Sequence, residues 1–303
     1  MPADPTVAGA ANLWRERGPH PSPFLRGVSF GVLTNPAGQS VVYGFGGCDV
    51  VESDFGQCTE DKIAIYNVAT DSWTFDAAFE VAVHSSNGVG AIAGKLYSSG
   101  GYNLLHAIDG LSSRTWAYDP VAGQATALAS MPKRTADGVT GVISSKLYVL
   151  PGLVDDNFEQ KPIRRLYRYD PATNKWGARK SAPHFHRSGA GGVIGGKLYV
   201  AGGLTNASLD VYDPATDTWT TRAPIPKVGR AIGTALGGKL YVVVGLDAYV
   251  YDPGTNRWTA IAGPTWQHEG LVRVVINGKP KLLAVGGSHN QDEDANNTEV
   301  YTP

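Results

Sequence analysis

Two stretches of sequence decide the fold: KLYVAGG at residues 197–203 and YDPATDTW at residues 212–219. An apolar run that ends in glycine is typical of a short strand whose end lies close to other packed groups. In the second stretch, proline presets φ and aspartate satisfies local backbone groups, so the residues between Tyr212 and Trp219 predict a tight turn between two strands.

Both stretches recur along the chain. The first has five further copies, each running through apolar residues into glycine, which begin at Val41, Lys95, Lys146, Lys239 and Lys281. The tyrosine of the second recurs at intervals of 39 to 52 residues, and in four copies a tryptophan follows it by seven residues. Repetition at such a period indicates a repeat architecture, here six four-stranded sheets in series.

The paired glycines, the spaced Tyr and Trp, and the six copies resemble the kelch repeat family over essentially the whole chain. This resemblance implies an all-β, six-bladed kelch-type β-propeller, with strand a of each blade lining a central channel and strand d outermost. We therefore predict a single propeller domain over residues 1–303. The second copy has Ala125 in place of its tryptophan, so we expect blade 2 to pack less tightly.

The ends of the chain predict how the ring closes. The sixth copy stops at Thr302 and Pro303, before any tryptophan, whereas residues 12–19 (NLWRERGP) resemble residues 217–224 (DTWTTRAP). We predict that residues 11–18 supply the outer strand of blade 6, with Trp14 in the position of Trp219. Pairing the two ends would remove two exposed sheet edges.

Composition narrows the range of partners. Lys plus Arg (26) nearly balances Asp plus Glu (27), so there is no excess positive charge to attract nucleic acid or an anionic membrane. No apolar run is long enough to span a bilayer, and residues 1–11 lack the features of a signal peptide. We predict a cytoplasmic monomer, or a secreted protein if a leader has been removed, with no nucleic-acid or membrane partner.

The connections between strands b and c differ most in length. From the last glycine to the tyrosine they span 19, 17, 17, 9, 6 and 14 residues in blades 1 to 6. In a propeller these loops emerge on the same face as the d–a connections, which predicts a walled bowl that is open beside blades 4 and 5. Loops on a rigid scaffold commonly carry function, although neutral variation in length would leave the same pattern.

The d–a connections lead into the innermost strands, so their side chains are expected at the channel mouth. Arginine presents a planar fork that suits carboxylate or phosphate. We therefore expect the mouth to bind an anionic ligand through Arg26, His84, Arg134, Arg187, Arg230, Trp266 and Asp137. The alternative is that these arginines belong to the repeat itself and bond to neighbouring blades.

Candidate catalytic residues are His268, Glu269 and His186. An imidazole can move a proton near neutral pH, and a carboxylate beside arginines can act as a base. Because adjacent side chains of a strand face opposite ways, only one of His268 and Glu269 is expected to enter the channel. The same alternation places His184 and His186 on one side.

No cofactor and no metal are predicted. Residues 289–294 (HNQDED) have oxygen ligands but lack the spacing and the glycine of a calcium loop. Cys48 and Cys58 bracket the first b–c loop, where they would form a disulfide or remain thiols according to the compartment.

We expect a small polar, anionic metabolite to bind in the axial pocket and to undergo non-redox acid–base chemistry of the isomerase, mutarotase or lyase type. Whether the protein is an enzyme is left open. At the level of fold it resembles the bacterial sialic acid mutarotases, which are stand-alone six-bladed kelch proteins. The alternative is a protein-interaction module that grips acidic peptides at the basic mouth.

Overall fold

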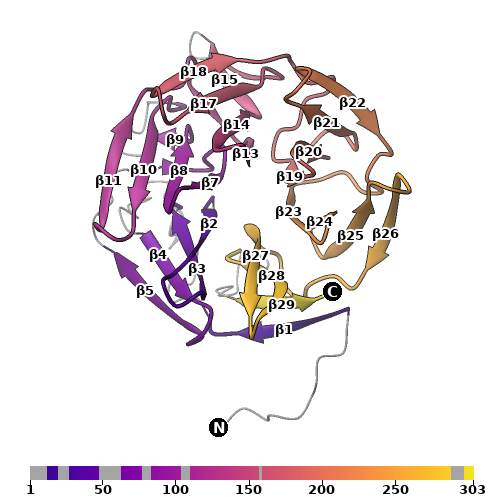
Figure 1. Cartoon of the computed structure of the whole chain (residues 1–303). Helices are drawn as coiled ribbons and strands as arrows, with labels where there is room; N and C mark the ends of the chain where they lie inside the picture. Colours follow the sequence, from indigo (N-terminus) through magenta and orange to yellow (C-terminus); the bar gives the residue numbers. More distant parts are fainter. Residues whose placement is uncertain are drawn as a thin grey trace, which may run out of the picture.

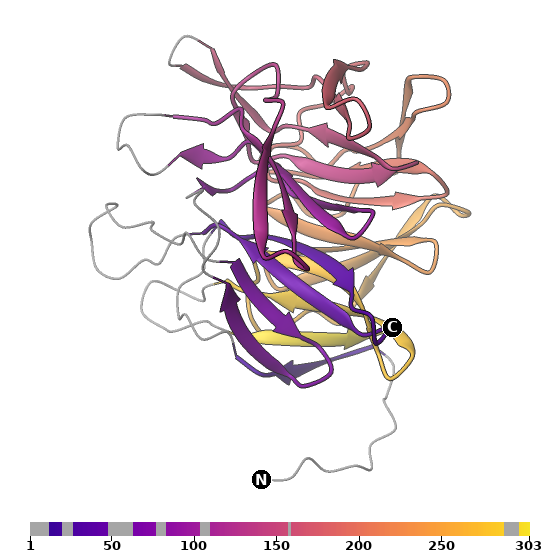
Figure 2. The same cartoon turned by 60° about the vertical axis from the view of Figure 1, so that its left-hand side comes forward.

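The computed structural model describes residues 12–19, 27–47, 63–76, 83–103, 110–156, 159–287 and 297–303. Six four-stranded antiparallel sheets stand around a central axis like the blades of a propeller (Figure 1). Turning the molecule shows neighbouring sheets stacked face to face around the ring (Figure 2). This architecture confirms the predicted six-bladed propeller. Among the described residues, no helix has the length and apolar character of a membrane span.

In each blade the strands run from the axis outward. Blade 1 consists of β2 (Ser29–Thr34), β3 (Ser40–Phe45), β4 (Ile63–Asn67) and β5 (Ser72–Asp76). Blade 2 consists of β7 (Val89–Ile92), β8 (Lys95–Ser99), β10 (Thr115–Asp119) and β11 (Gln124–Leu128). Blade 3 consists of β13 (Val139–Ile143), β14 (Lys146–Leu150), β17 (Tyr167–Asp170) and β18 (Lys175–Ala178). Blade 4 consists of β19 (Ala190–Ile194), β20 (Lys197–Ala201), β21 (Leu209–Asp213) and β22 (Thr218–Arg222). Blade 5 consists of β23 (Ala231–Leu236), β24 (Lys239–Val244), β25 (Asp247–Asp252) and β26 (Arg257–Ile261). Blade 6 consists of β27 (Gly270–Ile276), β28 (Lys279–Val285), β29 (Thr298–Thr302) and β1 (Leu13–Arg17).

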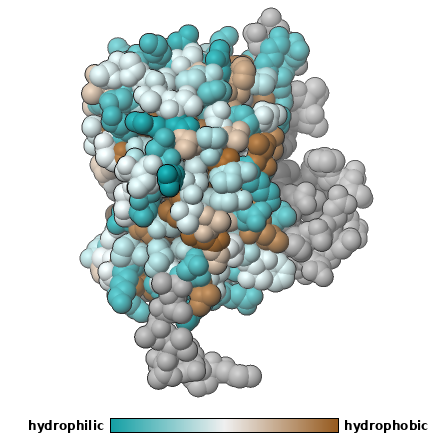
Figure 3. All heavy atoms as spheres, turned by 90° about the vertical axis from the view of Figure 1, so that its right-hand side faces the viewer, coloured by the Kyte–Doolittle hydropathy of each residue, from teal (hydrophilic) through white to brown (hydrophobic). Residues whose placement is uncertain are grey.

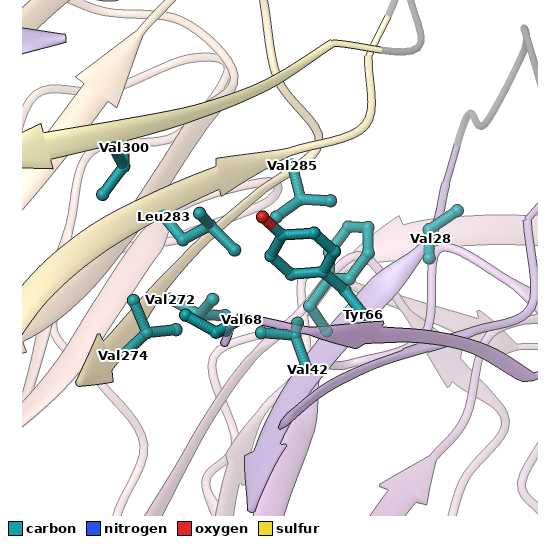
Figure 4. Packing of buried hydrophobic residues seen from close by; sticks show 10 residues of the cluster. Val28, Val42, Tyr66, Val68, Val272, Val274, Leu283, Val285 and Val300 are labelled. Atoms are coloured by element: carbon teal, nitrogen blue, oxygen red, sulfur yellow. The ribbon is translucent and has the colours of Figure 1, made fainter. Parts of the chain in front are cut away.

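Burial follows the position of a strand in its blade. After its first residue, strand b is apolar and buried on both faces, as in β14. Strand d is mostly exposed, with a few partly buried residues such as the tryptophan at its second position in β5 and β26, because its outer edge meets solvent. The cores lie between blades: Val272, Leu283 and Val300 of blade 6 pack against Val42 and Tyr66 of blade 1 (Figure 4). The outside of the ring near blades 4 and 5 is largely hydrophilic, with hydrophobic residues interspersed (Figure 3).

One clasp, repeated five times, joins neighbouring blades. An Asn or Asp that directly precedes strand d, within the c–d turn in every case except Asn12, accepts a hydrogen bond from the tyrosine hydroxyl of its own blade. It accepts another from a backbone N–H that follows strand d of the preceding blade. The five residues are Asn12, Asp71, Asn174, Asp217 and Asn256. All five have a left-handed φ between 51° and 63°, which Asn and Asp tolerate better than most residues.

The tryptophan on strand d completes the clasp. Its indole N–H donates to a backbone carbonyl that follows strand d of the preceding blade, as from Trp258 to Ala223 at 2.8 Å. The same bond recurs from Trp14, Trp73, Trp176 and Trp219. The spacing between tyrosine and tryptophan therefore reflects contacts between blades as well as within one.

Blade 2 lacks both parts of this clasp, since Gly123 stands at the turn position and Ala125 at the tryptophan position. Tyr118 instead donates a 2.5 Å hydrogen bond to the carboxylate of Asp76 on blade 1. Asp76 thus provides a hydrogen bond between blades 1 and 2 where the clasp is missing.

The ring closes as predicted. β1 pairs antiparallel with β29 and is the outer strand of blade 6, and Trp14 lies opposite Tyr301. Asn12 and Trp14 form the clasp to blade 5, and the Gly18 N–H donates to Asp71 of blade 1. The first described residues therefore link blades 5, 6 and 1.

Candidate functional site

The axis of the propeller contains a cavity of about 570 Å³. Its walls are the innermost strands of all six blades, which are rich in glycine and valine. Four of its lining residues are charged: Asp137, Arg230, Glu269 and Arg273. We call the end where the innermost strands begin the mouth.

Backbone hydrogen bonds join five blades around the mouth. The N–H groups of Ser85, Asp137, Ser188 and Ala231 donate in turn to the carbonyls of Gly27, Ser85, Asp137 and Ser188. Ser85, Asp137 and Ser188 adopt a left-handed φ of 48° to 55°, and Gly27 has a φ of 70°. We call the five residues Gly27, Ser85, Asp137, Ser188 and Ala231 the rim. Residues of different blades are compared by their position relative to the rim residue of each blade.

Glu269 completes the rim at blade 6. Its carboxylate accepts a 3.1 Å hydrogen bond from the N–H of Gly27 in blade 1 and forms an ion pair with Arg230 of blade 5. The side chain of Glu269 is 12% exposed, whereas that of Arg230 is 48% exposed. The carboxylate is thus held in the cavity wall beside a cation that solvent and ligands can reach.

A second ion pair crosses the neighbouring blades. The Nε of Arg187 lies 3.2 Å from the carboxylate of Asp137, which is 10% exposed, while the arginine side chain is 42% exposed. Asp137 lines the cavity. Both arginines therefore bond to a carboxylate of a neighbouring blade, and their side chains stay partly exposed. Arg230 lines the cavity, whereas Arg187 does not.

Arg134 lies outside the register assumed from the sequence. The rim residue of blade 3 is Asp137, so Ala136 occupies the position of Arg187, and the side chain of Arg134 is 58% exposed near Asp155, at 4.0 Å. It is absent from the cavity lining. The residues just before the rim of blade 3 form β12 (Thr135–Ala136), which pairs with the hairpin of β15 (Leu153–Asp156) and β16 (Glu159–Pro162).

His186 and His268 face into their blades. Both side chains are fully buried, and each ring uses both nitrogens: one contacts a glycine carbonyl and the other a carboxylate. The carboxylates are Asp210, 3.1 Å from His186, and Glu299, 2.8 Å from His268. Neither ring reaches the cavity, so their geometry supports a structural role in place of the catalytic one that we expected.

The other described candidates do not line the cavity. Trp266 is partly buried, and its indole lies 3.5 Å from Glu16, away from the cavity lining. His84 belongs to β6 (Val83–His84), whose backbone pairs with β9 (Tyr102–Asn103). Arg26, Cys48, Cys58 and residues 289–294 lie outside the described residues.

Arg273 is a functional candidate that the sequence search missed. It lies opposite Leu282 in strand b, and the same position in the other five blades is apolar and also lines the cavity: Val32, Ala91, Val142, Val193 and Ala235. Arg273 is exposed and has no hydrogen bond or ion pair to a described residue. A single charge in the apolar run GLVRVVI, residues 270–276, was the available signal.

The cavity can bind a molecule with ends of different chemistry. Glu269 and Arg273 are four residues apart along one strand, which corresponds to about 13 Å. The far end presents one unpaired cation within an apolar layer, and the mouth presents two ion pairs. No cluster of three or more His, Cys, Asp or Glu side chains with the geometry of a metal site occurs among the described residues.

Comparison with known proteins agrees with this architecture. Residues 187–226 match the model of the Kelch motif family. The chain is 24% identical over 257 residues to Kelch-like protein terF of Aspergillus terreus, covering 76% of this chain and 55% of that protein. It is 26% identical over 275 residues to Kelch-like protein 35 of Mus musculus, covering 87% and 44%. The chain thus spans about half the length of the curated relatives that it matches.

A solved structure supports the same fold. The structure of YjhT superimposes with a TM-score of 0.72 at 16% sequence identity, covering 93% of this chain and 94% of that one. The chain therefore has the fold of a kelch-type β-propeller and carries a Kelch motif at residues 187–226.

Proposed function

We propose that the axial cavity binds a small polar anion, whose carboxylate or other acidic group pairs with Arg273 and whose polar end lies between the mouth ion pairs. The observation that supports this most directly is the unpaired guanidinium of Arg273 in an otherwise apolar layer of the cavity. Arg273 is exposed to the cavity and has no ion pair with a described residue, so a bound anion would supply the opposite charge that it lacks. The volume of about 570 Å³ suits a ligand of metabolite size.

Glu269 is the group best placed for acid–base chemistry, which we propose as the second part of the function. Opening and reclosing a sugar ring requires a base that takes the proton of the anomeric hydroxyl and a proton delivered to the ring oxygen. Glu269 can take the first proton, and water at the open mouth can deliver the second. The ion pair with Arg230 holds the carboxylate in place.

The test of binding uses Arg273→Met, which removes the charge but keeps much of the side-chain volume. We expect the wild type to bind small carboxylates, with the acidic sugar glucuronate as the first probe, because its carboxylate and its anomeric hydroxyl are attached to different carbons of the ring. R273M should bind at least tenfold more weakly in isothermal titration calorimetry. Arg273→Lys should retain part of the affinity. Equal affinity of R273M and the wild type would contradict the proposed binding mode.

The test of catalysis uses Glu269→Gln and measures anomer exchange by NMR. A reduced exchange rate with little change in affinity is expected if the carboxylate acts as the base. An unchanged rate in E269Q would remove Glu269 from the proposal and leave the binding function standing.

A protein-interaction function is the second candidate, because the guanidinium groups of Arg187 and Arg230 are accessible while their carboxylate partners are buried. Exposed apolar side chains of the same blades accompany them: Phe185, Leu204, Val228 and Leu246. Binding of a fluorescent acidic peptide that is weakened by R187Q and R230Q, but not by R273M, would favour this function over the first.

A further inference from the structure

A second site of positive charge lies where blade 6 meets blade 1. It includes a lysine whose ion-pair partner, present in four other blades, is absent from blade 6. In four blades the lysine that opens strand b forms an ion pair with the aspartate that ends strand c. The pairs are Lys95–Asp119 at 3.1 Å, Lys146–Asp170 at 2.7 Å, Lys197–Asp213 at 2.7 Å and Lys239–Asp252 at 3.2 Å. Blade 6 keeps the lysine, Lys281, but has Thr302 in place of the aspartate. No described carboxylate pairs with Lys281.

Three further cations lie on the same face of blade 6 as Lys281. Side chains two residues apart on a strand share a face, and directly paired residues share it too. Lys279 is two residues from Lys281, while Arg15 and Arg17 pair with Val300 and Thr298, which share the face of Thr302. We call Arg15, Arg17, Lys279 and Lys281 the seam cluster.

The charges of the seam cluster are poorly compensated. Arg17 is neutralised in part by Asp71, at 3.4 Å, and it also donates to the carbonyl of Val68. The charged groups that act on Lys281 are all cations: burial lowers the pKa of Lys281, and Arg15, Arg17 and Lys279 lower it further. Glu16, the acid between the two arginines, lies on the opposite face of β1, where it meets Trp266.

A cavity of about 410 Å³ adjoins the cluster. It lies between the a–b turns of blades 6 and 1, and Arg17 and Ile276 contribute to its lining. Lys279 is the cross-strand partner of Ile276. Val68, which lines this cavity, belongs to the same core cluster as Val274 and Val300 of blade 6 (Figure 4).

We propose that the seam cluster and its cavity bind the phosphoryl group of a small phosphate or phosphate ester. Arg15, Lys279 and Lys281 leave a local charge of about three, which a dianion neutralises better than a single carboxylate. Arginine offers paired donors to phosphoryl oxygens, and lysine adds a compact charge. The anion supplies the negative charge that the aspartate provides in four other blades, and it would stabilise the joint that closes the ring.

The experiment measures binding of inorganic phosphate and pyrophosphate by ³¹P NMR and calorimetry. Lys281→Met should weaken binding at least tenfold, and Thr302→Asp should do the same, because the new carboxylate would pair with Lys281 as in the other blades. Lys239→Met, which removes the equivalent lysine of blade 5, should bind as the wild type does. Phosphate should raise the melting temperature of the wild type and leave that of T302D unchanged.

Two outcomes would overturn the proposal. Equal binding by T302D, K281M and the wild type would show that the seam cluster does not hold the anion. Loss of phosphate binding in R273M alone would place the ion in the axial cavity. The second outcome supports the function proposed for that cavity, so the two sites are judged separately.

Discussion

At the scale of single residues, two buried histidine–carboxylate pairs fasten the mouth ends of blades 4 and 6. Asp210 accepts hydrogen bonds from His186, from Thr221 and from the backbone of His184. Burial raises the pKa of Asp210, but these hydrogen bonds lower it by more than burial raises it. The pKa of Asp210 therefore lies below the ordinary 3.8. The pKa of Glu299 lies below its ordinary 4.5 for the same reasons, with His268 and Thr265 as donors.

These lowered pKa values make stability depend on acid pH. A carboxyl group whose pKa is lower in the folded state stabilises the fold above its unfolded pKa, and that contribution is lost as pH falls through the folded pKa. Glu299→Gln should therefore lower the free energy of unfolding by about 1–3 kcal/mol at pH 7. The difference from the wild type should shrink below about pH 4.

Thermal unfolding between pH 3 and 8 measures this effect. Asp247→Asn, which affects an exposed ion pair with Lys227, is the matched control and should change stability little at any pH. A difference between E299Q and the wild type that is the same at pH 3.5 and pH 7 would contradict the assignment.

The same residues show what sequence can predict about a site. The alternation rule predicted that only one of His268 and Glu269 enters the channel. Glu269 lines the cavity and His268 does not, but both residues precede β27, which begins at Gly270, so strand alternation is not what separates them. Arg134 was predicted as the basic residue of its d–a connection, but the rim hydrogen bonds place Ala136 in the position of Arg187. Arg273 was missed because the search covered the connections between blades, and this residue lies within a strand.

At the scale of elements, the clasp between blades explains why a turn residue matters as much as a buried aromatic one. Asn256 accepts hydrogen bonds from Tyr251 of its own blade, at 2.7 Å, and from the N–H of Ala223, at 3.0 Å. The sequence predicted the turns and the Tyr–Trp spacing. It did not reveal that the Asn bonds to the preceding blade, since that contact depends on how the sheets stack.

Asn256→Gly tests the clasp. Glycine accepts the left-handed φ of 55°, so the substitution removes the two hydrogen bonds without straining the backbone. We expect a loss of about 2 kcal/mol in the free energy of unfolding, measured by denaturant titration.

Gly123→Asn is the converse variant, because blade 2 lacks the clasp residue and its φ of 60° suits Asn. It should keep or raise stability, by up to about 1 kcal/mol. Wild-type stability in N256G, or a clear loss in G123N, would show that the clasp contributes little.

At the scale of the whole molecule, the ring depends on one short strand from the beginning of the described chain. β1 supplies five residues of pairing to β29, and Trp14 lies 5.1 Å from the ring of Tyr301. Trp14 and Asn12 bond to blade 5, while Arg17 and Gly18 bond to blade 1. Without this strand, blade 6 would have an unpaired edge and its joints to blades 5 and 1 would lose these bonds.

Deletion of residues 1–18 should therefore open the ring. We expect a large fall in melting temperature and faster proteolysis of blade 6, because the loss includes a strand, an aromatic pair and both clasps at the seam. Deletion of residues 1–11 keeps β1 and is the control, which should melt close to the wild type. Trp14→Ala should lie between the two, at a cost of about 3 kcal/mol. If the 1–18 deletion melted with the control, closure by β1 would not be what holds the propeller together, and the stacking of blade 6 on blade 1 through Val272, Leu283 and Val300 would have to account for it.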